Sequence, residues 1–332
     1  NGGVVKEIFT KGINPFYQSE IDIKYEIEHF LLPELKNFEL VGISFYGAGC
    51  AFPDKKAIVC NALGACFKDT AIEVHSDLLA AARALFGKSE GIACILGTGS
   101  NSCFYDGNVI VDNISPLGFI LGDEGSGAVL SRKFVSDCLK NQLSDEIKKS
   151  FLEKYELTPA DILENVYKKP FPNRYLAAFT PFLRDNIDNS AIYDIVYGGF
   201  VDFFKRNVMQ YDYKNHKTGI IGSVGFHFKD QLISAADECG VQLGSIDQSP
   251  MAGLIKYHIE KITEQNSLHS NLDTKSVHDL LVEMNEEDLK VPVAVSKAIP
   301  QIEQLVEKIV ERMKRGGRIF YRGGGTSGRL GV

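Results

Sequence analysis

Residues 91–103, GIACILGTGSNSC, form the stretch of sequence that decides the fold. An apolar run ends at the loop Gly97-Thr98-Gly99-Ser100, and a second apolar run follows it. This pattern predicts two strands joined by a tight hairpin turn. The same loop suits a phosphate, because glycine lets backbone N–H groups approach an anion and Thr98 and Ser100 add short hydroxyl donors. It is not a Walker A loop, since no Gly-Lys-Ser/Thr follows, and the hairpin and phosphate interpretations both stay open on this stretch alone.

Two more glycine loops and one aspartate bear on that choice. Residues 122–127, GDEGSG, precede a predicted helix, and residues 222–225, GSVG, overlap the end of a strand predicted over 218–223. Asp77 follows a short strand predicted over 71–74 and precedes an apolar helix over 78–86. It is either the N-cap of that helix or a carboxylate placed to take a proton from a substrate hydroxyl. Glycine-ended strands that converge from two α/β units predict a nucleotide cleft between domains.

The rest of the chain predicts an α/β protein with a change of pattern near residue 265. Residues 264–276 are polar without an apolar period and predict a linker, and the helix after it has Pro300 near its start. The expected strands are 4–10, 40–46, 91–97, 102–106, 109–113 and 318–322, and the expected helices are 20–36, 54–67, a long helical stretch over 127–210, 229–239 and an amphipathic helix over 299–315.

Composition excludes several classes of protein. The 332 residues, 44% hydrophobic and 24% charged, are enough for two or three domains. A net charge of −7 without a basic, aromatic-containing cluster argues against a nucleic-acid partner, and no apolar stretch of membrane-spanning length predicts a membrane segment. The seven cysteines are scattered and never spaced C-x-x-C, which predicts neither a disulfide framework nor a protein metal site and favours a cytoplasmic location. A homodimer is compatible with the sequence.

Residues 1 to about 262 resemble the N-acetylglucosamine kinase family, within the BadF/BadG group of actin-like ATPases. The segments that carry the resemblance run in family order: GINPF (12–16), FYGAGC (45–50), HSD (75–77), GIACILGTGSNSC (91–103), SPLGFILGDEGSGA (115–128), KPFPNR (169–174), IGSVGFHF (221–228) and QSPMAGLIKYH (248–258).

The resemblance implies two RNase H-like domains that close on ATP, Mg²⁺ and an amino sugar and transfer the γ-phosphoryl group to the sugar 6-hydroxyl. Residues 1–88, completed by a helix over 249–264, would form the first domain and residues 89–248 the second. Matched by position, Asp77 is the catalytic base. The resemblance places the phosphate loop at Gly97, Thr98, Gly99 and Ser100, the sugar contacts at Asn14, Asn101, Gly118 and Asp123, and the adenosine side at Gly222, Ser223 and Gly225.

The family pattern also contains a first strand and a phosphate loop of the type Asp-Ser-Gly-Ser-Thr-Lys-Thr that are not in residues 1–332. In the family, the aspartate of that loop helps to hold Mg²⁺ and its backbone holds the β- and γ-phosphates. We therefore expect a kinase fold that lacks its first strand and loop. Residues 1–332 alone should have little or no kinase activity.

The loop GGGTSG at 323–328 fits G-x-G-x-x-G after a predicted strand, which is a weak dinucleotide pattern by itself. Residues 271–332 instead resemble the start of the N-acetylmuramic acid 6-phosphate etherase family, which has a sugar-isomerase (SIS) fold. In that family the Thr-Ser-Gly-Arg segment opens a helix that binds the sugar phosphate, which assigns this contact to Thr326 and Ser327. With a linker over 265–276, residues 277–332 would be an incomplete, helical part of such a lyase.

The order kinase–etherase bears on the acceptor sugar. An etherase that consumes N-acetylmuramic acid (MurNAc) 6-phosphate would be supplied by a kinase that phosphorylates MurNAc, in cell-wall sugar recycling, whereas the kinase family name points to N-acetylglucosamine (GlcNAc). Two alternatives stay open. One is a BadF-type activator ATPase with a cysteine-bound iron–sulfur cluster, and the other is a non-catalytic amino-sugar sensor with a kinase fold.

Overall fold

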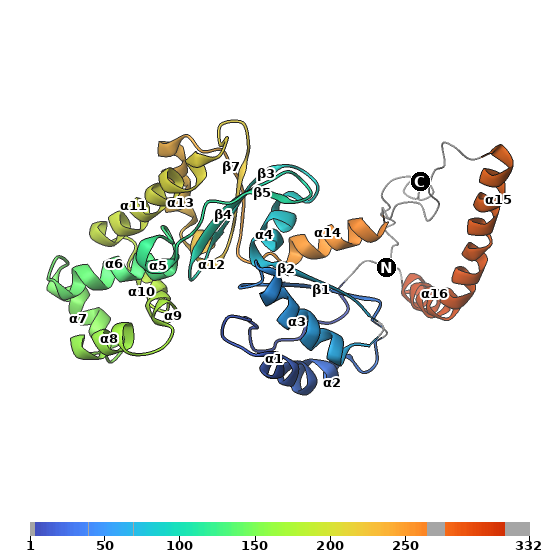
Figure 1. Cartoon of the computed structure of the whole chain (residues 1–332), viewed down its shortest axis with the longest axis horizontal. Helices are drawn as coiled ribbons and strands as arrows, with labels where there is room; N and C mark the ends of the chain where they lie inside the picture. The colour runs from blue at the N-terminus through green and yellow to red at the C-terminus, as the bar shows by residue number, and fades with distance from the viewer. Residues whose placement is uncertain (1–3, 39, 69, 264–275, 316–332) are drawn as a thin grey trace. The chain divides into compact units, whose positions relative to one another are not determined.

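The computed structural model describes residues 4–38, 40–68, 70–263 and 276–315 (Figure 1). The chain divides into two compact units, Asn1–Glu264 and Gln265–Val332. The finer division of the first unit into domains at residues 88 and 248 stays a prediction.

A mixed five-stranded sheet forms the centre of the first unit, in the order β5-β4-β3-β6-β7. β3 pairs antiparallel with β4 and parallel with β6, and β6 pairs parallel with β7. β3 is buried along almost its whole length because helices cover both of its faces, as its continuous apolar sequence requires. The strands are β3 (Gly91–Leu96), β4 (Ser100–Tyr105), β5 (Ile110–Asp112), β6 (Thr218–Ile221) and β7 (Leu243–Asp247).

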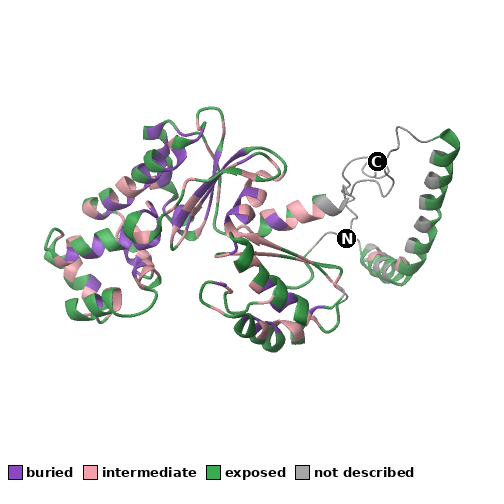
Figure 2. Cartoon of the chain, in the orientation of Figure 1, coloured by how far each residue is buried: buried purple, intermediate pink, exposed green. Residues whose placement is uncertain are grey.

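The long helical stretch expected after residue 127 is a series of separate helices that pack a phenylalanine-rich core on one side of this sheet. Phe134, Phe151, Phe182 and Phe200 are fully buried in it, and buried residues gather in the sheet and its helices (Figure 2). The elements of this part are α5 (Gly118–Leu121), α6 (Gly127–Leu139), α7 (Asp145–Lys154), α8 (Pro159–Tyr167), α9 (Pro172–Ala177), α10 (Thr180–Asp185), α11 (Ser190–Arg206), η2 (Val208–Gln210), α12 (Ser223–His227) and α13 (Lys229–Cys239).

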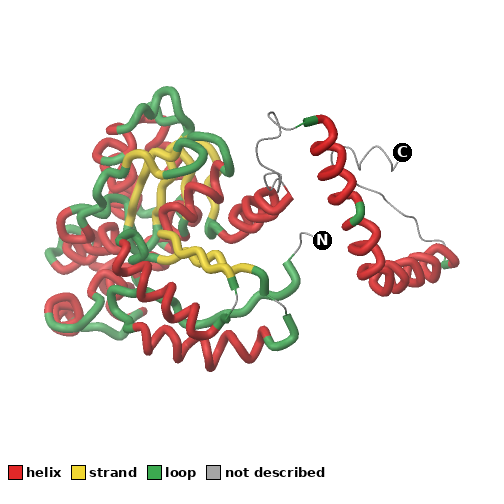
Figure 3. Tube along the Cα trace, turned by 45° about the vertical axis from the view of Figure 1, so that its right-hand side comes forward, coloured by secondary structure: helices red, strands yellow, loops and turns green. Residues whose placement is uncertain are grey.

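A second, two-stranded sheet is formed by β1 (Gly42–Gly47) and β2 (Ala71–Ser76), which run parallel (Figure 3). α3 (Pro53–Cys66) packs on it, and α1 (Glu20–Glu26), begun by a Ser19–Asp22 capping box, packs on α3. The strand expected over 4–10 is wrong: residues 4–10 pair with no strand among those described, and Phe9 is 86% exposed. An apolar run becomes a strand only when a neighbouring strand takes its hydrogen bonds.

The helix expected over 20–36 exists, but it is interrupted. A π-helical turn, η1 (Ile27–Leu31), separates α1 from α2 (Leu32–Leu35), and the N–H of Leu32 donates to the carbonyl of Ile27. Pro33 follows at once; it has no N–H, and its ring crowds the carbonyl four residues earlier. The wider turn accommodates that proline without ending the helix.

α4 (Asp77–Phe86) lies where the two sheets meet. It packs against β3, β4 and β6 and also contacts β1 and β2. α14 (Met251–Thr263) packs on α4, and Gly253 makes this approach possible, because a Cβ there would lie 2.3 Å from the carbonyl oxygen of Ala84. No helix in the described part of the chain is long and apolar enough to cross a membrane.

The described part of the second unit consists of α15 (Val277–Asp288) and α16 (Lys290–Lys314). The expected helix start near residue 299 is wrong, because α16 begins nine residues earlier and contains Pro300 in its interior, where the missing N–H leaves the carbonyl of Ser296 without its helical donor. Ile299, Ile302 and Val306 are about half exposed, as the amphipathic pattern predicts. Several predictions lie outside the described residues: the linker over 264–276 except its last residue, the strand over 318–322, and the contacts at Thr326 and Ser327.

Candidate active site

A cavity of about 900 Å³ opens where β1, α4, β3, β6 and α14 meet. Its lining is mostly apolar, from residues such as Phe45, Ile95 and Leu254. Two residues that the sequence predicts for the site line it, Asp77 from α4 and Gly222 from the end of β6. A largely apolar cavity with a few polar groups is the usual form of a small-molecule site.

Asp77 is the first residue of α4, directly after β2. The N-cap alternative for Asp77 is wrong: Ser76 is the N-cap, and its hydroxyl accepts a hydrogen bond from the N–H of Leu79 at 3.2 Å. The Asp77 Oδ1 accepts one from the N–H of Leu78 at 2.9 Å. Burial raises the pKa of Asp77 above its ordinary value, and hydrogen bonds from the N–H groups of Leu78 and of Asp77 itself oppose the rise only in part. A carboxylate with a raised pKa is a stronger base than an exposed one.

The loop at residues 97–99 is a hairpin turn between β3 and β4, closed by a hydrogen bond of 3.0 Å from Gly97 N–H to the Gly99 carbonyl. Hydrogen bonds from α6 also hold this loop. The first N–H groups of α6, those of Gly127 and Ala128, donate to the carbonyls of Gly97 and Thr98 at 2.8 and 3.1 Å. The loop carbonyls are therefore turned toward the helix.

The backbone N–H groups of this loop differ from its carbonyl groups. Among the residues that the structure describes, no acceptor meets the backbone N–H groups of Thr98 and Gly99, and Thr98 is exposed. The loop is a hairpin, and because backbone N–H groups without an acceptor can bind an anion, the phosphate interpretation stays a prediction beside it.

The three glycine loops meet as the sequence predicts. Gly222 has a backbone φ of +131°, and a Cβ there would lie 2.2 Å from the Leu96 carbonyl oxygen and 3.2 Å from the Gly97 nitrogen. A Cβ on Gly127 would come within 3.3 Å of Val224. Gly225 also lies close to the sheet, since a Cβ there would be 2.7 Å from Ile220. Only glycine at residue 222 lets the two loops approach this closely.

Asp123 joins the GDEG loop to the hairpin loop. Its Oδ1 accepts from the N–H of Ser100 at 3.4 Å, and a Cβ on Gly99 would lie 3.0 Å from its Oδ2. Its backbone is left-handed, with φ of +55°, held by its own N–H, which donates to the Pro116 carbonyl. Burial, with a smaller contribution from the charge of Glu124, raises the pKa of Asp123 to about 6. A buried carboxyl with a strained backbone and a raised pKa is a candidate functional residue.

The raised pKa of Asp123 predicts a pH-dependent stability. Its folded-state pKa lies above the unfolded value of 3.8, so the protonated form favours folding below pH 3.8 and this stabilisation disappears as the pH rises through about 6. The free energy of unfolding of the wild type, minus that of Asp123→Asn, should fall by about 2 kcal/mol between about pH 4 and pH 7. Urea titrations of both proteins across this range measure it, and a constant difference would show that Asp123 keeps an ordinary pKa.

None of the predicted sugar contacts lines the cavity. Asn101, the second residue of β4, lies directly opposite Ile95, so both side chains lie on the same sheet face, and Ile95 lines the cavity. Asn14 lies at the carboxyl edge of the small sheet, where a Cβ on Gly49 would come within 2.5 Å of its Oδ1, but it does not line the cavity. Gly118, with φ of +74°, begins α5 and does not line it either. Ser223 follows Gly222 as the first residue of α12.

A polar cluster that no sequence motif indicates lies at the wall of the cavity, which Tyr46 and His258 line. The Tyr46 hydroxyl accepts from Arg83 Nη1 at 2.8 Å and lies 2.9 Å from His258 Nε2. Arg83 also stacks over the ring of Tyr257. These residues come from β1, α4 and α14, so the cluster ties three elements together. No sequence pattern could show it, because its members are up to 212 positions apart.

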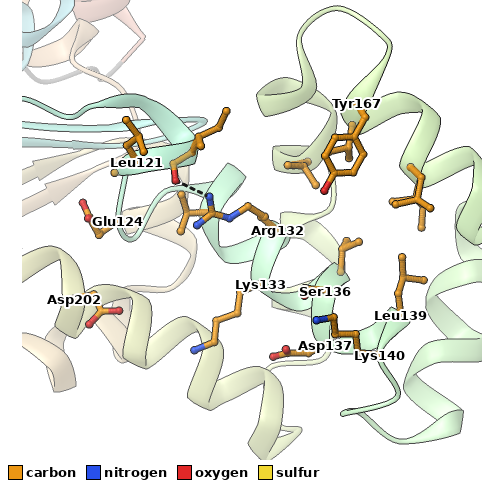
Figure 4. A pocket seen from close by; sticks show the side chains of 18 of the residues that line it. Leu121, Glu124, Arg132, Lys133, Ser136, Asp137, Leu139, Lys140, Tyr167 and Asp202 are labelled. Atoms are coloured by element: carbon orange, nitrogen blue, oxygen red, sulfur yellow. Dashed lines mark hydrogen bonds between the residues drawn. The ribbon is translucent and has the colours of Figure 1, made fainter.

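A second cavity, of about 740 Å³, lies between α5, α6, α8 and α11 (Figure 4). Arg132 in its wall donates to the carbonyls of Phe119 and Ile120, and Arg206 pairs with Glu124 at 2.6 Å. The Glu124 carboxylate also accepts from the side-chain amide of Asn207. Glu124 of the GDEG loop lines this cavity, whereas none of the residues predicted for the kinase site does.

The described residues include backbone groups that could bind the phosphates of a nucleotide. They contain no group of three or more His, Cys, Asp or Glu side chains that could hold a metal ion. The free N–H groups of Thr98 and Gly99 and the close approach at Gly222 suit phosphate oxygens. Mg²⁺ is commonly held through nucleotide phosphates with few protein carboxylates.

The fold is that of the actin-like ATPases, and solved structures of sugar kinases share it. A structure from Porphyromonas gingivalis, provisionally named an N-acetylglucosamine kinase, is 47% identical, covers 79% of this chain and 93% of its own, and superposes with a TM-score of 0.77. A Chromobacterium violaceum protein with the same provisional name shares the fold at 14% identity and a TM-score of 0.54, over 71% of this chain and 83% of its own. The chain belongs to the N-acetylglucosamine kinase family.

The chain is also similar to a second family over a shorter length. An N-acetylmuramic acid 6-phosphate etherase of Bacteroides fragilis is 65% identical over 72 residues, which are 22% of this chain and 26% of the relative. The etherase of Porphyromonas gingivalis is 62% identical over 73 residues, 27% of its length. The chain thus spans about a quarter of these curated relatives. No family model matches the chain.

Proposed function

We propose that the first unit is an ATP-dependent amino-sugar kinase that phosphorylates the 6-hydroxyl of GlcNAc or MurNAc. The observation that carries the proposal is the shared cavity: a carboxylate of raised pKa, Asp77, lines it together with Gly222, which adjoins a hairpin loop with two free N–H groups. The family to which the chain belongs gives the proposal its substrate class.

In this proposal Asp77 accepts the proton of the sugar hydroxyl as the hydroxyl oxygen attacks. MgATP would supply the electrophilic γ-phosphoryl group. Thr98 and Gly99 would donate their N–H groups to phosphate oxygens, with Ser100 beside them, and Gly222, Ser223 and Gly225 would border the nucleotide. Asn14, Asn101, Gly118 and Asp123 would orient the sugar. Catalysis of phosphoryl transfer rests mainly on such positioning, with one base to take the proton.

The second family supports a choice between the two acceptor sugars. The relatives that match about 22% of the chain are named for MurNAc 6-phosphate, and a kinase joined to such an enzyme would supply that substrate from MurNAc. On this argument MurNAc is the favoured acceptor and GlcNAc the second candidate. The etherase activity itself would need the rest of that relative, including its sugar-phosphate contacts, for which Thr326 and Ser327 are our candidates.

The acceptor is tested by offering the whole protein MurNAc, GlcNAc and glucose in separate reactions with MgATP and comparing kcat/KM, with the products identified by mass. MurNAc 6-phosphate as the preferred product supports the link between the two families. A preference for GlcNAc would keep the kinase assignment and remove the argument from the etherase. Phosphorylation of no sugar would contradict the proposed function.

Two observations speak against the alternatives. Cys94 and Cys103 are fully buried, and burial raises the pKa of Cys103 to about 12 and that of Cys94 well above its usual range, so neither is a ready thiolate ligand for an iron–sulfur cluster. A sugar sensor has no need of a base, yet the Asp77 carboxylate lies in the cavity with its pKa raised.

A further inference from the structure

The amide of Asn101 is held in one orientation by its neighbours. Its Oδ1 accepts two hydrogen bonds, from the N–H of Ser102 at 2.9 Å and from the Nδ2 of Asn113 at 3.0 Å. A backbone N–H can only donate, so the atom that faces Ser102 must be the oxygen. The orientation therefore follows from hydrogen-bond chemistry and not from the assignment of oxygen and nitrogen.

The orientation of Asn113 is fixed by the same logic. Its Nδ2 lies 2.6 Å from the carbonyl oxygen of Ser102 and 3.3 Å from that of Ile114, in addition to the Asn101 Oδ1. Carbonyl oxygens only accept, so the atom of Asn113 that faces them must be the nitrogen. Asn113 thus donates to Asn101. The backbone carbonyls of Ser102 in β4 and of Ile114, the next residue, hold its amide in place.

The segment that carries Asn113 is fixed from the protein interior. The N–H of Ile114 donates to the Tyr211 hydroxyl at 2.8 Å, and this hydroxyl also lies 3.0 Å from the Oγ of Ser102. Tyr211 and Ser102 are buried, whereas Asn113 is exposed. A buried tyrosine therefore holds the strand of Asn101 and the segment of Asn113 at a constant separation.

With both acceptor positions of its Oδ1 used, Asn101 has only its Nδ2 hydrogens left for a ligand. In the described part of the chain, Nδ2 of Asn101 has no hydrogen-bond partner, and the side chain lies on the sheet face of Ile95, which lines the cavity of Asp77. Resting on the proposed function, we infer that Asn113 is a positioning residue that makes Asn101 a hydrogen-bond donor to an acceptor oxygen of the sugar.

Four variants test this inference, with GlcNAc as the sugar and the whole protein. Asn101→Ala removes the donor, and we expect the sugar KM to rise about 10-fold with the ATP KM unchanged. Asn101→Asp keeps an oxygen for Ser102 and Asn113 but turns an acceptor toward the sugar, so its sugar KM should rise at least as much. Asn113→Ala should raise the sugar KM about 3- to 10-fold. In the double variant Asn101→Ala/Asn113→Ala, the KM should equal that of Asn101→Ala, because Asn113 acts only through Asn101.

Asn108→Ala, on the neighbouring hairpin turn, is the matched control, because its side chain holds no hydrogen bond within the described residues, and it should leave all constants unchanged. A wild-type sugar KM for Asn113→Ala or for Asn101→Asp, or additive effects in the double variant, would overturn the inference. Calorimetric measurement of GlcNAc and MurNAc binding distinguishes a failure of the proposed function from a failure of the inference about Asn113. If the wild type binds GlcNAc but phosphorylates neither GlcNAc nor MurNAc, the proposed function fails while the same variants, scored by Kd, still decide the inference. If it binds neither sugar, both fail.

Discussion

Replacing Asp77 by asparagine should lower kcat for sugar phosphorylation by about 100- to 10,000-fold, the usual contribution of a positioned general base. The amide keeps the shape of the carboxylate and can still accept from the Leu78 N–H, but it cannot take a proton. The sugar Kd should change little, and the melting temperature should not fall, because the variant removes a charge that burial disfavours.

The chain offers a closely matched control for this variant. Asp145 is also the first residue of a helix, α7, and follows a serine N-cap, Ser144, as Asp77 follows Ser76. Asp145 is exposed and lines neither cavity described above. Asp145→Asn should leave kcat unchanged. Equal losses in both variants, or a kcat for Asp77→Asn close to that of the wild type, would remove Asp77 from the proposed role.

The pH profile of the wild type gives a second test of the same residue. The base must be unprotonated to act, and burial raises the pKa of Asp77 above 3.8. On the acid side kcat/KM should therefore fall at a pH above that expected of an exposed aspartate. An acid limb at the ordinary aspartate value would show that the reacting base is not buried.

Gly222→Ala should have the largest effect on stability, a loss of about 2–4 kcal/mol in the free energy of unfolding. Two causes act together: the backbone φ of +131° disfavours any side chain, and the new Cβ would lie 2.2 Å from the Leu96 carbonyl oxygen, an atom of the central strand that cannot move aside. The strand ends would separate, and nucleotide affinity should fall with them.

Gly198→Ala is the control for the Gly222 variant. Gly198 lies inside α11, has no positive φ, and a Cβ there would meet nothing within 4 Å. This substitution should raise stability by about 0.5–1 kcal/mol, because alanine favours the helix. Urea titration measures both variants. A Gly222→Ala protein as stable as the wild type would contradict the close approach of the two loops.

Local sequence patterns predicted much of the first unit. The hairpin at residues 97–99 and the approach of Gly222 to it follow from apolar runs that end at glycine. The carboxylate at the junction of β2 and α4 follows from a short strand that runs directly into an apolar helix. The strand expected over 4–10 failed because a strand depends on a neighbour that no local pattern supplies. Pro300 was misplaced because proline marks a helix start only on average, and α16 continues through it.

The contacts that orient the site were beyond sequence reasoning. Tyr211 lies 109 positions from Ser102, and Tyr46 lies 212 positions from His258. Asn113 is an exposed residue after a short strand, with no motif of its own. The positioning role that we propose for it depends on hydrogen bonds to two backbone carbonyls and one side-chain amide. Only the folded chain brings these groups together.

In the proposed function, the γ-phosphoryl group of ATP passes to an amino sugar, and not to water, in the cavity that Asp77 lines. The most direct measurement follows ADP and sugar 6-phosphate together, with the whole protein, MgATP, and MurNAc or GlcNAc. We predict one sugar 6-phosphate for each ADP formed, and very slow ADP formation without sugar. ADP formed at the same rate with and without sugar, with no sugar phosphate among the products, would contradict the account.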